Sequence, residues 1–121
     1  MKSCLADRYE KLSYGQLCYA GEEYTLLALR DRRFDPALPT ALVTGGVHGY
    51  ETSGVLGALT FLETEASGYA GRVNLLVAPC VSPWAYERIN RWNYDAIDPN
   101  RNFRPDGPAR EATALIELVC S

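Results

Sequence analysis

Apolar positions along the chain recur with two different spacings, which predict strands that alternate with helices. Compact apolar stretches with the pattern of buried strands cover residues 24–29, 40–44 and 72–78. Helical patterns follow the second and third of these strands, over residues 53–66, 83–91 and 109–119. This alternation predicts a single α/β domain over residues 1–121, with three αβα layers around a mixed, mostly parallel sheet.

Both ends of the chain also carry helical patterns. Residues 6–12 are compatible with a short helix. At the other end, the apolar stripe of the last predicted helix still continues at Val119 and Cys120, and neither Gly nor Asn follows to satisfy the final carbonyl groups. Two interpretations stay open, a frayed terminal helix and a longer fold that has been cut.

Composition and charge narrow the class of protein. The chain has 121 residues, the usual size of one domain, and its formal net charge of -3 provides no basic surface for nucleic acid. No apolar run approaches the ~18 residues that a membrane span needs, and a charge interrupts the amino-terminal stretch where a signal peptide is apolar. We therefore expect a cytoplasmic protein with neither nucleic-acid nor membrane partners.

The cysteines agree with a reducing compartment. They are widely spread, without a C-x-x-C pair, at Cys4, Cys18, Cys80 and Cys120. We interpret them as reduced and mostly buried thiols, although their even number leaves a disulfide open.

The only histidine, His48, lies in a glycine-rich segment between a predicted strand and a predicted helix. Residues 45–51 read GGVHGYE, so that His48 and Glu51 are three positions apart at the first turn of the helix. Ligands of α/β proteins usually bind at this edge of the sheet, and an imidazole with a carboxylate forms part of a catalytic zinc site. The alternative is a histidine held by a nearby glutamate, with the glycines serving only the turn.

A second cluster of polar residues follows the second predicted helix. Residues 97–103 read IDPNRNF, and residues 88–93 read RINRWN. Arginine forks and asparagine amides suit the recognition of a small anionic group, and ten of the twelve positively charged side chains are arginines. The alternative is a surface loop whose Asn and Asp side chains cap their own turns.

Taken together, the two clusters resemble motifs of the zinc carboxypeptidase superfamily, which also includes aspartoacylase and succinylglutamate desuccinylase deacylases. Residues 45–51 resemble its G-G-x-H-G-x-E motif, and residues 98–103 (DPNRNF) resemble D-x-N-R-N-F. Residues 82–87 (SPWAYE) resemble N-P-x-G-x-E, with serine and alanine in place of the usual asparagine and glycine. The resemblance covers roughly residues 21–118 and is to the amino-terminal half of the catalytic domain.

The resemblance assigns roles to single residues. It implies that His48 and Glu51 are the first two ligands of a Zn²⁺ cofactor. It also implies that Asn100 and Arg101 grip the terminal carboxylate of the substrate, and that Arg91 polarises the scissile carbonyl group. We expect Arg91 and Arg101 to converge on the same crevice as His48, because their loops leave one edge of the sheet.

The family's third zinc ligand and its general base come from the half of the domain that follows. No second histidine is present, and Glu111 and Glu117 are interpreted as the solvated face of the last predicted helix. The resemblance implies a metallocarboxypeptidase-like hydrolase acting on a peptide with a free carboxylate, incomplete in this chain. The alternatives are an N-acyl-amino-acid deacylase and a non-catalytic remnant or binding module. An uncovered apolar face predicts self-association or pairing with a complementing carboxyl-terminal half.

Overall fold

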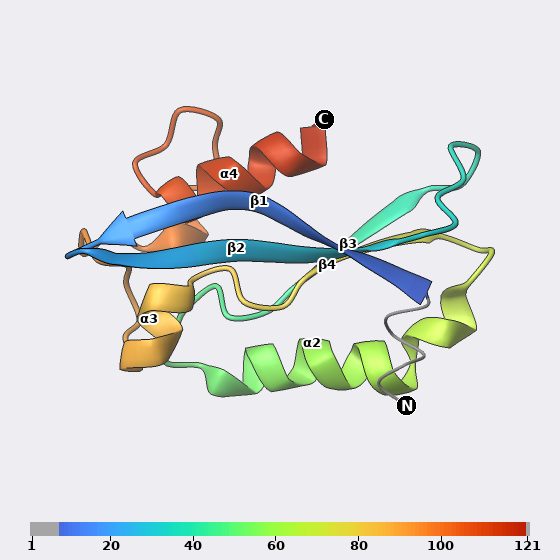
Figure 1. The fold of residues 1–121 in the computed structure, drawn as a ribbon, viewed down its shortest axis with the longest axis horizontal. Coiled ribbons are helices and arrows are strands. Elements are labelled where there is room, and N and C mark those ends of the chain that lie inside the picture. Colours follow the sequence, from blue (N-terminus) through green and yellow to red (C-terminus); the bar gives the residue numbers. More distant parts are fainter. Residues whose placement is uncertain (1–7, 121) are drawn as a thin grey trace.

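A long amino-terminal hairpin and two shorter strands form one sheet in the computed structural model, which describes residues 8–120 (Figure 1). The strands are β1 (Tyr9–Tyr19), β2 (Glu22–Asp31), β3 (Thr40–Thr44) and β4 (Asn74–Ala78). Within the described residues their order is β1-β2-β4-β3, with β1/β2 and β2/β4 antiparallel and β3/β4 parallel. The helices are α2 (Thr52–Thr64), α3 (Pro83–Arg88) and α4 (Arg110–Cys120), with short 3₁₀ turns η1 (Ala66–Tyr69) and η2 (Pro99–Arg101).

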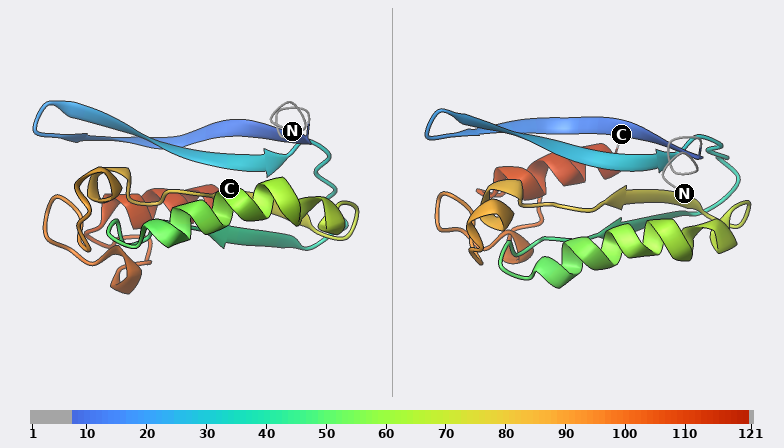
Figure 2. Two further views of the ribbon diagram at one scale, coloured as in Figure 1. Left: turned by 90° about the horizontal axis from the view of Figure 1, so that it is seen from below. Right: turned by 60° about the horizontal axis from the view of Figure 1, so that its bottom comes forward.

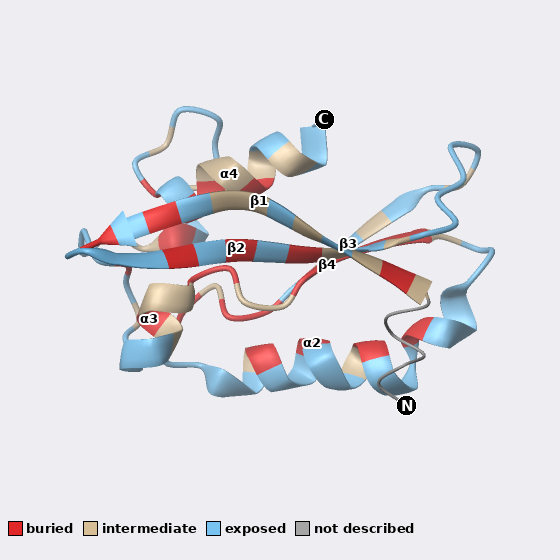
Figure 3. Cartoon of the chain, viewed as in Figure 1, coloured by how far each residue is buried: buried red, intermediate tan, exposed pale blue. Residues whose placement is uncertain are grey.

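Helices cover both faces of this sheet, so the predicted three-layer α/β arrangement is confirmed (Figure 2). On one face, Leu75 and Val77 of β4 share an apolar cluster with Leu62 of α2. On the other face, Ala78 packs with Leu115 of α4. This division follows from the alternation of side chains along a strand. Figure 3 shows the buried residues of α2 on the side of the helix that faces the sheet.

The predicted mixed sheet is confirmed, although parallel pairing is not in the majority among the described strands. Only β3 and β4 run in parallel: a tight hairpin makes β1 and β2 antiparallel, and β2 also pairs with β4 in the antiparallel sense. Its two turn residues, Ala20 and Gly21, have φ values of 52° and 82°, the left-handed conformations that allow a two-residue loop to match the twist of its strands.

The predicted strands and helices are found close to their expected places, but the short helix expected at residues 6–12 is wrong from Tyr9 onward. Tyr9 begins β1, whereas residues 6 and 7 lie outside the described residues. Pairing along the whole of β2 satisfies the backbone of this segment and overrides its local preference. A bulge at Tyr14, between paired residues Ser13 and Gly15, breaks the alternation that marks a strand in the sequence.

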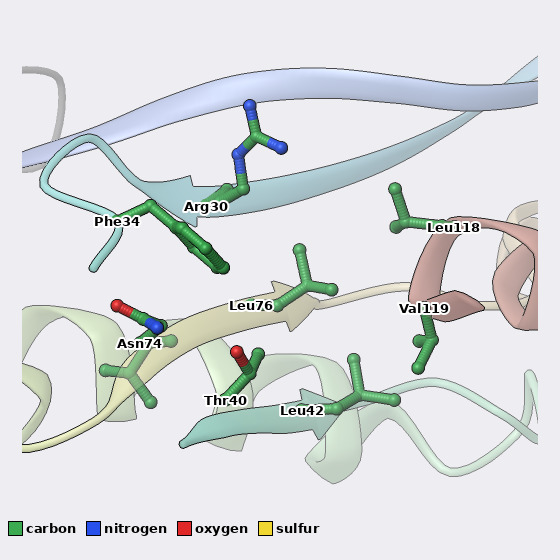
Figure 4. A pocket seen from close by; sticks show the side chains of 9 residues that line it. Arg30, Phe34, Thr40, Leu42, Asn74, Leu76, Leu118 and Val119 are labelled. Carbon is green, nitrogen blue, oxygen red and sulfur yellow. The ribbon is translucent and has the colours of Figure 1, made fainter. Parts of the chain in front are cut away.

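The face of β3 and β4 opposite α2 is only partly covered. A groove of about 250 Å³ remains beside the end of α4, between Phe34, Leu42, Leu76, Leu118 and Val119 (Figure 4). The groove lies near the first residues of the two strands, Thr40 and Asn74. It is therefore separate from the opposite end of these strands, where the histidine-containing loop begins.

The cysteines differ in part from the expectation. The three within residues 8–120 are free, but Cys18 and Cys120 are exposed, so the interpretation of mostly buried thiols is wrong for them. Cys18 alternates with the buried Leu17 and Tyr19 on β1, and Cys4 lies outside the described residues. Within residues 8–120, each helix is too short or too polar to cross a membrane.

Candidate functional site

The loop that carries His48 connects the end of β3 with the start of α2. It is fastened to the segment after β4 by backbone hydrogen bonds from Val81 to Gly45 (2.9 Å) and from Ser82 to Gly46 (3.0 Å). The Ser82 hydroxyl group also donates to the carbonyl oxygen of Val47 at 2.8 Å. Strands β3 and β4 therefore end side by side, at the end of the molecule where α2 begins and α3 lies (Figure 2).

Gly49 allows this loop to lie directly against α3. A Cβ atom at Gly49 would collide with the carbonyl carbon of Ala85. That contact is with backbone, which cannot rotate away as a side chain can. The close approach explains why a glycine follows His48.

The His48 ring lies between two carboxylates. Its Nε2 atom is 2.7 Å from Oδ1 of Asp98, and its Nδ1 atom is 3.3 Å from Oε1 of Glu51. The His48 and Asp98 side chains are only 9% and 11% exposed, whereas that of Glu51 is 55% exposed. The outer edge of the ring therefore faces Glu51 and solvent, and its inner edge faces Asp98.

Asp98 is the hydrogen-bond acceptor in its contact with His48. Partial burial acts to raise the pKa of Asp98, but hydrogen bonds from His48 and from the backbone N–H of Asn100, with the nearby charges of His48 and Arg91, together lower that pKa. An ionised carboxylate can only accept hydrogen bonds, so the proton of this contact belongs to His48 Nε2. The Nδ1 atom is then the one available to a ligand.

Two arginines meet the other oxygen of Asp98. Arg91 places Nη2 3.4 Å from Oδ2, and Arg101 places Nε 3.6 Å from it. Arg91 also donates from Nη1 to the hydroxyl group of Tyr50 at 2.9 Å. The expectation that both arginines lie near His48 is therefore confirmed, since each contacts the carboxylate that holds its ring.

The remaining predicted residue, Asn100, lies at the same place. Asp98 caps η2 by accepting from the backbone N–H of Asn100 at 3.0 Å. Asn100 is exposed, and the Arg101 side chain is 78% exposed. These two side chains are thus free to meet a ligand from solvent above the buried pair of His48 and Asp98.

Sequence reasoning missed three residues of this region. Asp98 is the first residue of the D-x-N-R-N-F motif, but no sequence pattern shows that it contacts His48. Tyr50 lies inside the histidine motif, but no pattern shows that it accepts a hydrogen bond from Arg91. The interpretation of Glu111 as solvent-facing is wrong, because this residue is 0% exposed. Glu117, on the other side of the helix, is exposed as expected.

The donor atoms of His48 and Glu51 have a separation that suits zinc. Two ligand atoms that each lie about 2.0–2.1 Å from a tetrahedral zinc ion are roughly 3.3 Å apart, and Nδ1 and Oε1 are 3.3 Å apart. The negative charge of the Glu51 carboxylate beside this ring nitrogen also favours a cation between them. Within residues 8–120, no three His, Cys, Asp or Glu side chains form a group that could hold a metal ion. The described residues therefore fit two positions of such a site.

Solved structures share this fold. A protein of Shewanella amazonensis described as a metallopeptidase matches with a TM-score of 0.79 and 27% identity, over 98% of this chain and 46% of that chain. An aspartoacylase family protein of Mesorhizobium loti matches with a TM-score of 0.70 and 25% identity, over 93% and 37% of the two chains. Bovine thrombin-activatable fibrinolysis inhibitor, solved with a tick carboxypeptidase inhibitor, matches in fold with a TM-score of 0.75 at 19% identity, over 98% and 51%.

No family model matches the chain, and no curated protein matches it in sequence. The chain spans between 37% and 51% of the length of these three solved structures. Their agreement with the sequence motifs confirms the resemblance: the chain has the fold of the amino-terminal half of a zinc carboxypeptidase-like domain.

Proposed function

We propose that the chain provides the first half of the active site of a zinc-dependent metallocarboxypeptidase, which removes the last amino acid of a peptide. The observation that carries this proposal is the arrangement of His48 between Asp98 and Glu51. One carboxylate holds the inner nitrogen of the ring, and a second, exposed carboxylate stands 3.3 Å from the outer nitrogen, where a metal ion could meet both.

In this proposal His48 and Glu51 hold the metal. When bound, zinc polarises a carbonyl group and lowers the pKa of a water molecule towards ~7. Asp98 keeps the proton on His48 Nε2 and so holds the ring with Nδ1 outward, as outer-sphere carboxylates do for ligating histidines. The third ligand and the general base are not assigned to residues of this chain.

The arginines bind and orient the substrate. Arg101 and Asn100 supply exposed donors for the free carboxylate of a peptide. Arg91 is held between Tyr50 and Asp98, where its charge stabilises the oxygen of the carbonyl group that is cleaved. Because the Tyr50 contact restrains Arg91 beforehand, little reorganisation is needed when that charge develops.

A second candidate is hydrolysis of an N-acyl amino acid. It is favoured by the similarity to the aspartoacylase family protein, at 25% identity. Both substrates present a free carboxylate to Arg101, so the arrangement of donors agrees with either. The two reactions are distinguished by the substrate cleaved once the site is complete, a peptide or an acyl amino acid.

The first test measures zinc binding by the 121-residue chain with isothermal titration calorimetry. We expect weak binding, because two protein ligands hold a metal loosely, and loss of that binding in His48→Ala and Glu51→Gln. Glu63→Gln, which changes an exposed glutamate of α2, is the matched control. Equal zinc binding by all variants would exclude the proposed ligands.

The second test assays hydrolysis of peptides and N-acyl amino acids, with zinc, by the chain alone and after mixing with the carboxyl-terminal half of the Shewanella amazonensis protein. We expect no turnover by the chain alone, because a missing general base by itself costs about 10² to 10⁴ in rate. Turnover of the mixture that a chelator abolishes would support the proposal. Chelator-sensitive turnover by the chain alone would contradict it.

A cytoplasmic location is also part of the proposal. It is supported by the free thiols of Cys18, Cys80 and Cys120, since disulfides are rare in reducing compartments. Fractionation of the source cells, with detection of the chain by antibody, tests this assignment, and recovery from the secreted fraction would contradict it.

A further inference from the structure

Glu111 is a charged residue with no access to solvent. It lies in the first turn of α4 and is 0% exposed. Its Oε1 atom accepts a hydrogen bond from Nδ2 of Asn93 at 3.1 Å, and its Oε2 atom accepts from the hydroxyl group of Tyr19 at 3.4 Å. Burial of a carboxylate is unfavourable unless its oxygens are satisfied. The environment of Glu111 therefore depends on these two donors.

Asn93, the first of these donors, closes the turn that follows Arg91. It is 3% exposed, and its Oδ1 atom accepts from the backbone N–H groups of Asp95 and Ile97, both at 3.0 Å. The backbone N–H of Asn93 donates to the carbonyl oxygen of Ile97 at 3.1 Å. One asparagine side chain thus holds residues 93–97 in a compact turn that ends next to Asp98.

The carboxylate of Glu111 decides which way the Asn93 amide points. Oε1 of Glu111 is the acceptor in this contact, so the NH₂ group of Asn93 faces the carboxylate. The carbonyl oxygen of the amide then faces the two backbone N–H groups of the turn. With the amide reversed, its NH₂ group would oppose those N–H groups, and its oxygen would oppose Glu111.

Tyr19 provides a second link between Glu111 and the same turn. Its ring stacks on the ring of Tyr94 with centroids 4.8 Å apart and planes inclined by 6°. The hydroxyl group that donates a hydrogen bond to Glu111 therefore belongs to Tyr19, whose ring packs on Tyr94 of the turn. The connection from α4 reaches the turn through both Asn93 and Tyr94.

We propose that Glu111 is a positioning residue: by orienting Asn93 it fixes the turn at residues 93–97, and so places Arg91 and Asp98 against His48. The turn joins these two residues directly, since Arg91 precedes Asn93 by two positions and Asp98 follows Ile97. The inference rests on the proposed function for what His48 and Arg91 do. Its test measures neither zinc nor turnover.

The test uses hydrogen–deuterium exchange of the full chain, followed by mass spectrometry. Glu111→Met fills similar space but offers no acceptor to Asn93 or Tyr19. We expect the amides of residues 93–98 to exchange about tenfold faster in this variant, with little change in β2. Glu111→Gln retains an acceptor oxygen, so wild-type protection is expected. Glu117→Met, an exposed position on the same helix, is the matched control.

Two outcomes of this exchange experiment on the Glu111 variants would overturn the proposal. One is an equal rise in exchange across residues 93–98 and β2 in Glu111→Met, which would show a general loss of stability. The other is the same exchange at residues 93–98 in Glu111→Gln and Glu111→Met, which would show that the acceptor has no role.

A second set of variants tests the proposal if Glu111→Met does not fold. In this set the donor and the acceptor of the Asn93–Glu111 hydrogen bond are swapped. Asn93→Asp alone sets two carboxylates against each other, and faster exchange of residues 93–98 is expected. Adding Glu111→Gln to this variant restores a donor opposite an acceptor, so protection should return. Failure of the double variant to restore protection would overturn the proposal.

The imidazole signals of His48 give a second readout, because no other histidine is present in the chain. At one fixed pH, a long-range ¹H–¹⁵N spectrum should show the proton on Nε2 in wild type and in Glu111→Gln. In Glu111→Met, and in the folded Asn93→Asp variant, the two nitrogen signals should move towards each other as the Asp98 contact loosens. An unchanged imidazole spectrum in these two variants would show that the turn does not position Asp98.

Discussion

Asp98 organises the candidate site by the contacts of its two oxygens. Oδ1 accepts from His48 and from the backbone N–H of Asn100, and Oδ2 faces Arg91 and Arg101. One carboxylate therefore sets the orientation of a proposed metal ligand and of two proposed substrate-binding arginines. Its substitution should disturb the site without touching the metal directly.

Asp98→Asn is expected to weaken zinc binding by about 10- to 100-fold, the usual effect of losing a carboxylate that orients a ligating histidine. The amide keeps the shape of the side chain but removes its charge. Isothermal titration calorimetry of the chain measures the effect, with Asp95→Asn, an exposed residue of the adjacent turn, as the control. Unchanged affinity in Asp98→Asn would show that Asp98 does not orient a ligand.

Cys80 should be the least reactive of the three described thiols. Burial raises the pKa of Cys80 to about 11, although a backbone hydrogen bond at Ser82 acts to lower it. Because the thiolate is the reacting form, alkylation at pH 8 should be slower by on the order of a hundredfold than for an ordinary thiol. Peptide mapping after timed iodoacetamide treatment measures this, with the exposed Cys18 and Cys120 as internal references. Equal rates at all three would contradict the burial of Cys80.

At the scale of elements, the site depends on how closely the loop before α2 lies to α3. Gly49 touches the backbone of α3 where any side chain would collide, whereas Gly57 lies in the exposed part of α2 with nothing within 4 Å of a Cβ atom. The two glycines therefore have opposite consequences for stability. One permits a contact between elements, and the other only weakens a helix.

Gly49→Ala should destabilise the chain by about 1 to 3 kcal/mol, since either the loop or α3 must move. Gly57→Ala should instead stabilise it by about 0.5 to 1 kcal/mol through helix propensity. Urea unfolding followed by circular dichroism measures both free energies of unfolding. A neutral Gly49→Ala variant would mean that the loop does not lie against α3 in solution.

At the scale of the whole molecule, buried phenol groups couple the fold to pH. Burial, and next the charge of Glu111, raise the pKa of Tyr19 from 10.0 to about 12, although Arg110 acts to lower it. Burial also raises the pKa of Tyr14. These tyrosines join β1 to the clusters around α3 and α4, so that their ionisation acts against the packing of several elements at once.

The sign of the pH effect follows from the raised pKa values. The folded chain favours the protonated phenol, so this stabilisation is complete below pH 10 and is lost as the pH rises from 10 towards 12, the range between the ordinary and raised pKa of Tyr19. Tyr19→Phe should lose less stability than wild type over this range, as measured by urea unfolding at several pH values. Parallel pH profiles for the two proteins would contradict the raised pKa.

Local patterns in the sequence are enough to predict the features that depend only on neighbouring residues. The strand at residues 40–44 and the three-residue spacing of His48 and Glu51 are of this kind, because side-chain periodicity and a glycine-rich turn act over a few residues. The D-x-N-R-N-F motif likewise marked Asn100 and Arg101 without knowledge of the fold. Their proximity to His48 followed from one further rule, that loops at one edge of a sheet meet.

Only the tertiary structure decides which residues meet across long separations. Asp98 lies 50 positions from His48, and Tyr19 lies 92 positions from Glu111. Whether Glu111 faces solvent depends on where α4 packs against β1 and the turn at residues 93–97. The polarity of Glu111 alone predicts an exposed side chain, whereas this residue is buried. A segment such as β1 becomes a strand by pairing with β2, because the hydrogen bonds of a sheet are made between segments and not within one.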